Sequence, residues 1–224
     1  MDRLQRITLL LGKEAVTKLQ KSTVMVVGCG AVGSVAIEAL ARSGVGHIVL
    51  VDFDKVEESN INRQLFALES TVGKSKVQIA AQRIADINPK IKIDIYDMFF
   101  DENTNIDIKP DFVIDAIDTV PSKIALYKWC EKNKVHFISS MGAARKTDLT
   151  KIKIDKISKT TVCPLAAKIR HTVRDLKIKD FPVVYSTETA TSQPNGGREF
   201  GSMITVTGVF GLMLADFVIK KLIS

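Results

Sequence analysis

The chain alternates between short apolar runs and longer segments in which apolar residues recur every three or four positions. The short runs predict buried strands, and the longer periodic segments predict amphipathic helices. The expected strands are Val24–Gly28, His47–Asp52, Ile91–Tyr96, Phe112–Ala116 and His136–Ser140. The expected helices are Arg3–Leu11 with a further turn at Glu14–Leu19, then Val32–Ser43, Lys74–Ile87 and Ser122–Asn133. This alternation predicts a Rossmann-like α/β fold, a largely parallel sheet with helices on both faces.

The pattern changes from about Thr147 onward. Alternating residues at Ile152–Ile154 and Val183–Ser186 predict two more strands, and Pro164–Leu176 predicts a basic helix with a proline in its first turn. Thr191–Phe200 is expected to be a loop. Since no repeat or linker divides the chain, we expect one domain over residues 1–224, with an N-terminal helical arm (1–22), a core (23–146) and an elaborated C-terminal third (147–224).

The location of the protein is indicated by its cysteines and its termini. The three cysteines are odd in number and far apart, which argues against disulfides and a four-cysteine zinc site and fits a reducing cytoplasm. The first six residues do not have the pattern of a secretory signal. The apolar stretch Met203–Ile219 is barely long enough to span a bilayer, and Asp216 within it favours a buried helix over a membrane anchor.

A glycine-rich turn follows the first expected strand and indicates nucleotide chemistry. Gly28, Gly30 and Gly33 allow a tight strand-to-helix turn, so that a phosphate can approach the backbone amides at the helix N-terminus. Asp52 ends the second strand, where a carboxylate can accept hydrogen bonds from ribose hydroxyls. By itself this pattern also fits an ordinary NAD- or FAD-binding protein.

The polar residues that follow favour a ligand with a triphosphate. Arg63 can donate a bidentate fork to a phosphate, and Lys76 adds positive charge at the start of the next helix. Asp118 follows the fourth strand, at the edge of the sheet where ligands bind in open α/β folds. A carboxylate at that position can hold Mg²⁺ that bridges phosphate oxygens. The combination therefore predicts an MgATP site, although Asp118 alone is also typical of a helix cap.

These motifs together resemble those of the adenylating enzymes of the ubiquitin-activating superfamily. The resemblance rests on the motifs Gly28-x-Gly30-x-x-Gly33, Asp52-Phe53-Asp54, Asn60-x-x-Arg63-Gln64, Lys74-x-Lys76 and Asp115-x-x-Asp118. It implies that ATP and Mg²⁺ are bound and that a substrate carboxylate is joined to the α-phosphate. The implied nucleotide-binding residues are Gly28, Gly30, Gly33, Asp52, Asp54, Asn60, Arg63, Gln64 and Lys76. The implied catalytic residues are Arg63, Lys76, Asp118 as the Mg²⁺ ligand, and Arg6, which in this family reaches the nucleotide of the partner subunit and so implies a homodimer.

The C-terminal third narrows the resemblance to one branch. Activators of sulfur-carrier proteins usually keep two Cys-x-x-Cys pairs, and this sequence has none. The segments Cys163–Arg170, Val184–Glu188 and Phe200–Ser202 instead resemble the tRNA threonylcarbamoyladenosine dehydratases, which activate the carboxylate of the modified base with ATP and close a ring with loss of water. An adenylyltransferase for a ubiquitin-like sulfur carrier remains the alternative, and a nucleotide-binding or redox protein without adenylation chemistry is a further one. The resemblance also leaves room for a cysteine desulfurase-type sulfur-transfer partner.

The distribution of charge agrees with a nucleic-acid substrate. The formal net charge is +7, and the window from Arg145 to Lys179 holds eleven lysines and arginines against three aspartates, a net +8. A local basic surface of this kind is typical of a site for a polyanion. Lys168, Arg170 and Arg174, on the expected basic helix, are the candidate tRNA contacts, with a solvated lysine face as the alternative.

In this branch some relatives carry a cysteine before the Ser-Thr-Glu stretch, where this chain has Pro182, Val183 and Val184, so a thioester step there is unsupported. Cys163 stands at a helix start before a proline, a position more typical of a structural cysteine than of a nucleophile.

Overall fold

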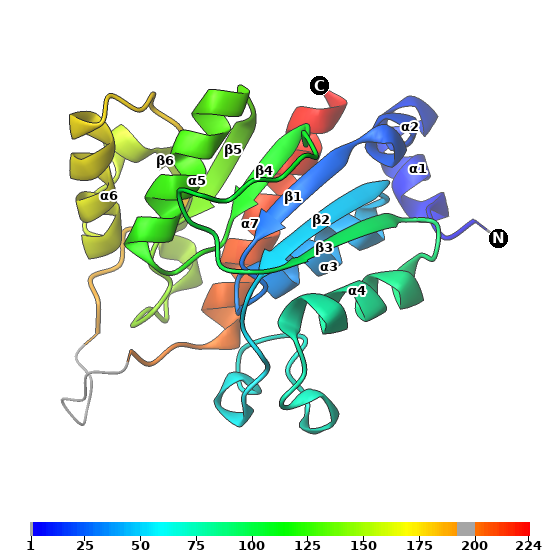
Figure 1. Ribbon diagram of the computed structural model, residues 1–224, viewed down its shortest axis with the longest axis horizontal. Coiled ribbons are helices and arrows are strands. Elements are labelled where there is room, and N and C mark those ends of the chain that lie inside the picture. Colours follow the sequence, from blue (N-terminus) through cyan, green and yellow to red (C-terminus); the bar gives the residue numbers. More distant parts are fainter. Residues whose placement is uncertain (1, 192–199) are drawn as a thin grey trace.

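The protein forms a seven-stranded sheet with helices on both faces in a computed structural model that describes residues 2–191 and 200–224 (Figure 1). The strand order is β3-β2-β1-β4-β5-β7-β6, and every pair is parallel except β6 with β7. The strands are β1 Thr23–Val27, β2 His47–Asp52, β3 Lys92–Asp97, β4 Phe112–Asp115, β5 His136–Ser140, β6 Ile152–Lys156 and β7 Pro182–Ser186. The predicted α/β class is confirmed, and the two strands of the C-terminal third extend the same sheet.

The helices lie close to the expected positions. They are α1 Gln5–Leu11, α2 Lys13–Lys21, α3 Gly33–Ser43, α4 Lys76–Ile87, α5 Val120–Asn133, α6 Pro164–Asp175 and α7 Ile204–Ile223. Short 3₁₀ turns include η1 Glu58–Asn60 and η4 Ile157–Lys159. Helix α4 starts two residues later than expected, because Gly73 has a positive φ of 83° and Ser75 is extended. Helix α5 starts two residues earlier, since a proline is tolerated in the first turn of a helix.

Two apolar layers cover the two faces of the sheet. Successive residues of β1 point to opposite faces, so Val24 and Val26 pack in one layer with α3, α4 and α7, while Met25 and Val27 pack in the other with α5 and α6. All four of these side chains are buried. Both faces of the central strands are therefore covered, as in other parallel sheets, and their carboxyl ends meet at one edge.

Helix α7 is the last element of the chain, and one of its faces is buried against the sheet and α3. Val206, Phe210, Leu214 and Val218, each four residues apart, are completely buried. Gly211 packs so closely against α3 that a Cβ there would lie 2.4 Å from the carbonyl oxygen of Val32. The opposite face is exposed and carries the ion pair of Asp216 with Lys220. Among the described residues, no helix is long and apolar enough to cross a membrane.

Candidate active site

A cleft of about 660 Å³ opens at the carboxyl edge of the sheet. The residues that follow β1, β2, β3, β4 and β5 line it, together with residues at the starts of α4, α5 and α6. Connections from β1 and β4 leave in opposite directions there, because the strand order reverses between these neighbours. Ligands of open α/β sheets bind at such a switch point.

The glycine turn has the geometry that the sequence predicts. Gly28 has a φ of 97°, and a Cβ there would lie 2.7 Å from the carbonyl oxygen of Ala116. Gly30 lines the cleft, and a Cβ there would contact only Gln64 Nε2, at 3.8 Å, which leaves its backbone open to a ligand. Gly33 is outside the cleft lining, and a Cβ there would lie 1.7 Å from the carbonyl oxygen of Gly28. Its part is therefore to let α3 pack against the turn.

Two carboxylates stand at the end of β2 beside this turn. Asp52 Oδ2 accepts a hydrogen bond from the backbone N–H of Cys29 at 2.6 Å, and Oδ1 accepts one from that of Asp54 at 2.8 Å. Burial raises the pKa of Asp52, and these hydrogen bonds and Lys76 partly oppose the shift. Asp54 Oδ2 pairs with the Lys76 ammonium at 2.7 Å. Hydrogen bonds and an ion pair thus connect the turn, the end of β2 and the start of α4.

Cationic and amide side chains lie on the neighbouring wall of the cleft. Arg63 is half-buried and donates to the carbonyl oxygen of Ser59 at 2.8 Å, Gln64 is buried, and Lys76 is 6% exposed. All three line the cleft. Asn60 does not: its side-chain oxygen accepts from the backbone N–H of Glu57 at 3.2 Å and caps η1. The expected nucleotide contact of Asn60 is therefore replaced, in this geometry, by a cap that shapes the loop carrying Arg63.

Asp118 stands across the cleft, exposed in the turn between β4 and α5. Ser122, at the start of α5, also lines the cleft, and its buried hydroxyl has no hydrogen-bond partner among the described residues. No group of three or more histidine, cysteine, aspartate or glutamate side chains in the described part of the chain has the arrangement of a metal site. On this side of the cleft Asp118 therefore stands as a single carboxylate.

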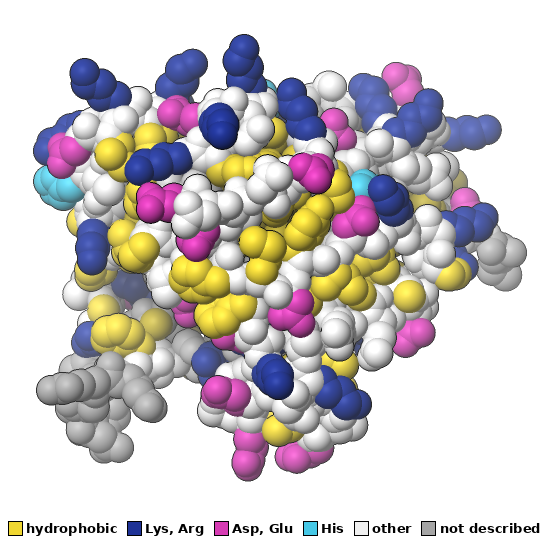
Figure 2. Space-filling model, viewed as in Figure 1, with side chains coloured by type: hydrophobic (Ala, Val, Ile, Leu, Met, Phe, Trp, Pro, Cys, Tyr) yellow, Lys and Arg dark blue, Asp and Glu magenta, His cyan; other side chains and the backbone are white. Residues whose placement is uncertain are grey.

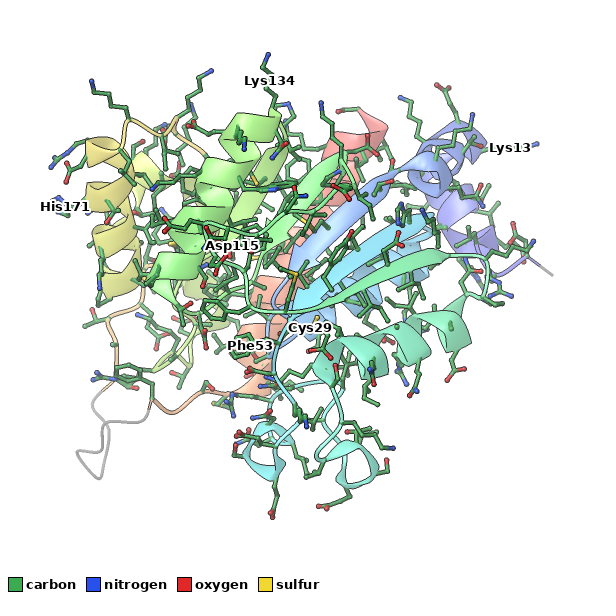
Figure 3. The ribbon with its side chains drawn as sticks, in the orientation of Figure 1. Lys13, Cys29, Phe53, Asp115, Lys134 and His171 are labelled. Atoms are coloured by element: carbon green, nitrogen blue, oxygen red, sulfur yellow. The ribbon has the colours of Figure 1, made fainter. Side chains whose placement is uncertain are left out.

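Beneath this turn lies a buried polar network that the sequence reasoning missed. Lys123 of α5 is fully buried; its ammonium donates to Asp115 Oδ2 at 2.8 Å and to the Ser140 carbonyl oxygen at 2.8 Å. The Tyr127 hydroxyl also donates to Asp115 Oδ2, at 2.9 Å, while Oδ1 accepts from the backbone N–H of Ile117 at 3.0 Å. Figure 3 marks Asp115 between the sheet and α5. The network fixes the ends of β4 and β5, the two strands that carry the floor of the cleft.

The protonation states in this network follow from its burial. Burial raises the pKa of Tyr127 well above its usual range, and the Asp115 carboxylate adds to the shift. The phenol therefore stays protonated and remains a donor. The only signal for the network in the sequence was a lysine three residues into an otherwise apolar helix face, a pattern that surface lysines also produce.

The remaining wall of the cleft comes from the C-terminal half of the chain. It consists of the segment after β5 and the start of α6, with residues Ser140, Met141, Gly142, Ala143, Ala144, Arg145, Lys146, Cys163, Pro164 and Leu165, and with Ala190, Phe200 and Ser202. Cys163 is 3% exposed and is the residue before the first turn of α6. None of these residues belongs to the nucleotide-binding motifs. The motif residues that line the cleft, which we call the nucleotide wall, are Gly28, Gly30, Asp52, Asp54, Arg63, Gln64 and Lys76.

The other predicted residues lie away from the cleft. Arg6 is exposed on α1 and does not line the cleft of its own chain. Lys168 and Arg174 are exposed on α6, but Arg170 is half-buried and donates to the carbonyl and hydroxyl oxygens of Thr160 at 2.8 and 2.7 Å. Arg170 is thus less free for a ligand than expected. Arg170 and Arg174 border a second hollow of about 340 Å³, and Figure 2 shows Lys and Arg side chains along the nearby edge above α5 and α6.

Residues 2–224 match the ThiF family, and the chain belongs to it. The sequence is 49% identical over 193 residues to the tRNA threonylcarbamoyladenosine dehydratase of Bacillus subtilis, covering 84% of this chain and 76% of that protein. The fold is similar to crystal structures of the tRNA N6-threonylcarbamoyladenosine dehydratase of E. coli with ATP and with AMP, at TM-scores of 0.91 and 0.92. In both, identity is 35%, and 98% of this chain and 93% of that chain are covered.

Relatives of the alternative kind are similar over a smaller part of the chain. The molybdopterin-synthase adenylyltransferase of Haemophilus influenzae is 37% identical over 129 residues, or 57% of this chain and 52% of that protein. The comparisons therefore confirm the predicted family and favour the dehydratase branch over the sulfur-carrier activators.

Proposed function

We propose that this protein is an ATP-dependent tRNA-modifying enzyme that activates the carboxylate of threonylcarbamoyladenosine in tRNA and cyclises the substituent with loss of water. The observation that carries the proposal is a cleft lined by most of the predicted nucleotide-binding residues, in a chain similar over nearly its whole length to dehydratases of this activity. We also propose that residues 1–224 form one catalytic domain that acts in the cytoplasm.

The residues of the nucleotide wall have proposed roles in binding ATP. The Gly28–Gly30 backbone and the start of α3 bind phosphate oxygens, and Asp52 orients the ribose. Arg63 and Lys76 neutralise the phosphates, and Lys76 is already held in place by Asp54. Mg²⁺ usually keeps one or two protein carboxylates and completes its shell with phosphates and water, and Asp118 fits that pattern. When bound, the ion supplies charge neutralisation at the phosphates.

Mass spectrometry of nucleosides from tRNA tests the proposed activity. Threonylcarbamoyladenosine-containing tRNA incubated with the protein and MgATP is expected to yield a nucleoside lighter by one water, and omission of ATP is expected to prevent the change. Unchanged tRNA together with adenylation of a small protein ending in Gly-Gly would favour the sulfur-carrier alternative.

We propose further that the active unit is a homodimer in which Arg6 completes the partner's cleft. Arg6 and Leu10 lie four residues apart on α1 and so share a helix face, and Leu9 and Leu10 are 76% and 80% exposed. Such apolar exposure is typical of a protein interface. A cysteine desulfurase-type sulfur-transfer partner stays a prediction of the family resemblance.

Mixing two inactive variants tests the shared site. Arg6→Ala and Asp118→Ala proteins are each expected to be inactive, but after subunit exchange some clefts contain both intact residues, so activity should return to about a quarter of the wild-type level. Each variant incubated alone is the control. If no activity returns although exchange is demonstrated by mass spectrometry of tagged subunits, Arg6 acts within its own chain or not at all.

The basic helix α6 is the proposed contact for tRNA phosphates outside the cleft. It begins at the cleft wall, and Arg174 lies ten residues along it, about 15 Å away at the rise of an α-helix. Because Arg170 is bonded to Thr160, Lys168→Ala with Arg174→Ala is the cleaner test. This double variant is expected to weaken tRNA binding and to leave ATP affinity unchanged. The slope of log tRNA affinity against log salt concentration is expected to become shallower by the equivalent of about one to two phosphate contacts. Unaltered salt dependence would mean that these side chains form only a solvated face.

A further inference from the structure

Lys146 has an unusual environment for a lysine. It is 3% exposed, lies on the C-terminal wall of the cleft, and its ammonium donates to the backbone carbonyl oxygen of Glu188. The Glu188 carboxylate is itself occupied by the backbone N–H groups of Thr147 and Asp148. In the described part of the chain no carboxylate is within ion-pair distance of the Lys146 ammonium, which contacts Glu188 through the backbone oxygen, although the charge of Lys146 contributes to a lowered pKa of the Glu188 carboxylate. Buried charges in proteins are normally paired, so this ammonium calls for an anion from outside the chain.

The two other buried lysines differ from Lys146 in this respect. Lys76 pairs with Asp54, and Lys123 pairs with Asp115, at 2.7 and 2.8 Å. Lys76 lies on the nucleotide wall, whereas Lys146 lies beyond the end of β5, across the cleft. The positive charge of Lys146 is thus separate from the residues assigned to the triphosphate.

The wall around Lys146 is apolar and closely packed. Met141, Ala143 and Cys163 are buried and line the cleft, and Leu165 adds a half-buried side chain. The segment after β5 lies directly against the start of α6, since a Cβ on Gly142 would meet Cys163 Sγ at 3.5 Å and Leu165 Cβ at 3.7 Å. Small side chains such as Ala144 keep space open in front of this wall. Apolar walls with a few polar groups that fix orientation are typical of sites for small organic ligands.

We infer that this half of the cleft is the acceptor subsite, which takes the modified purine turned out of the tRNA stack and holds its carboxylate with Lys146. The inference rests on the proposed function and names where its substrate binds. An enzyme that acts on a base must take it out of the stack, because the reacting atoms are otherwise inaccessible. A carboxylate bound by Lys146 lies in the same cleft as the proposed site of the ATP α-phosphate. The two reacting groups must be held close together for the carboxylate to be joined to that phosphate. The subsite also selects for tRNA that already carries the acidic substituent.

The test compares tRNA with and without the threonylcarbamoyl group, bound to protein in the presence of AMP. Wild-type protein is expected to bind the modified tRNA more tightly, by about tenfold or more, as a hydrogen bond to a charged group provides. Lys146→Met is expected to bind both tRNAs with the weaker affinity and to keep wild-type affinity for ATP. Lys151→Met, which removes an exposed lysine of the same basic region, is the matched control and is expected to keep the discrimination.

A further variant tests the apolar wall independently of Lys146. Ala144→Trp fills the subsite and is expected to abolish tRNA-dependent turnover without weakening ATP binding. Undiminished discrimination in Lys146→Met, or turnover in Ala144→Trp at the wild-type rate, overturns the inference. Weakened ATP binding in Lys146→Met also overturns it, because Lys146 then belongs to the nucleotide site. If wild-type protein leaves threonylcarbamoyladenosine unchanged, the proposed function fails instead.

Discussion

Replacement of Lys123 by methionine is expected to lower the free energy of unfolding by about 3–5 kcal/mol, the usual result of leaving one member of a buried ion pair without its partner. Methionine keeps most of the side-chain volume, so loss of the charge dominates the effect. In the variant, Asp115 stays buried with only hydroxyl and backbone donors, and the Ser140 carbonyl loses its cation. Urea unfolding followed by circular dichroism measures the change.

The same helix provides the matched control. Lys128 lies on α5 five residues further on and is exposed, so Lys128→Met is expected to change stability by less than about 0.5 kcal/mol. A double variant, Lys123→Met with Asp115→Leu, is not expected to recover fully, since Asp115 also binds the Ile117 N–H that shapes the turn carrying Asp118. If Lys123→Met unfolds at the same urea concentration as Lys128→Met, the network does not stabilise the fold.

Arg63→Ala and Asp118→Ala are expected to lose tRNA-dependent ATP turnover while the fold is retained. Asp118 is exposed and Arg63 is half-buried; both line the cleft, and neither belongs to the apolar core. Loss of a hydrogen bond to a charged group costs about 1.5–3 kcal/mol, roughly a ten- to hundredfold decrease, and more where the contact strengthens in the transition state. Single-turnover assays with radiolabelled ATP measure the rate, and thermal melting checks the fold.

Arg42→Ala is the control for these two variants. Arg42 is an exposed arginine on α3 whose ion pair with Glu38 lies away from the cleft, and surface pairs of this kind contribute about 0–1 kcal/mol. Its turnover is expected to equal that of the wild type. If Arg63→Ala and Asp118→Ala also turn over ATP at that rate, the nucleotide is bound elsewhere than in this cleft.

Local patterns were sufficient for most of the elements. The bounds of β2 and β5 agree with those expected, and the basic helix ends one residue earlier than expected. Departures of two residues, at the starts of α4 and α5, arise where glycine or proline permits a backbone that periodicity does not describe. Part of the loop expected at Thr191–Phe200 falls on residues 192–199, outside the described residues.

The candidate site was predictable where function depends on position along a strand. Gly28, Asp52 and Asp118 each come at the end of a buried strand, and parallel strands bring their carboxyl ends together. Arg63 and Lys76 reached the same cleft because their loops return to it. Asn60, in the same motif as Arg63, turned out to cap η1, since a carboxamide satisfies a nearby backbone N–H as readily as a ligand.

The sequence alone determined the order of strands and helices, the glycine turn and the set of residues able to bind a nucleotide, because each depends on neighbours a few positions away. Tertiary structure decided which lysines are buried and what they face. Lys123 meets Ser140 seventeen residues away, and Lys146 meets Glu188 forty-two residues away. The charge of a lysine is the same everywhere in the sequence, and only the packing of distant segments determines whether solvent, a carboxylate or an open cleft surrounds it.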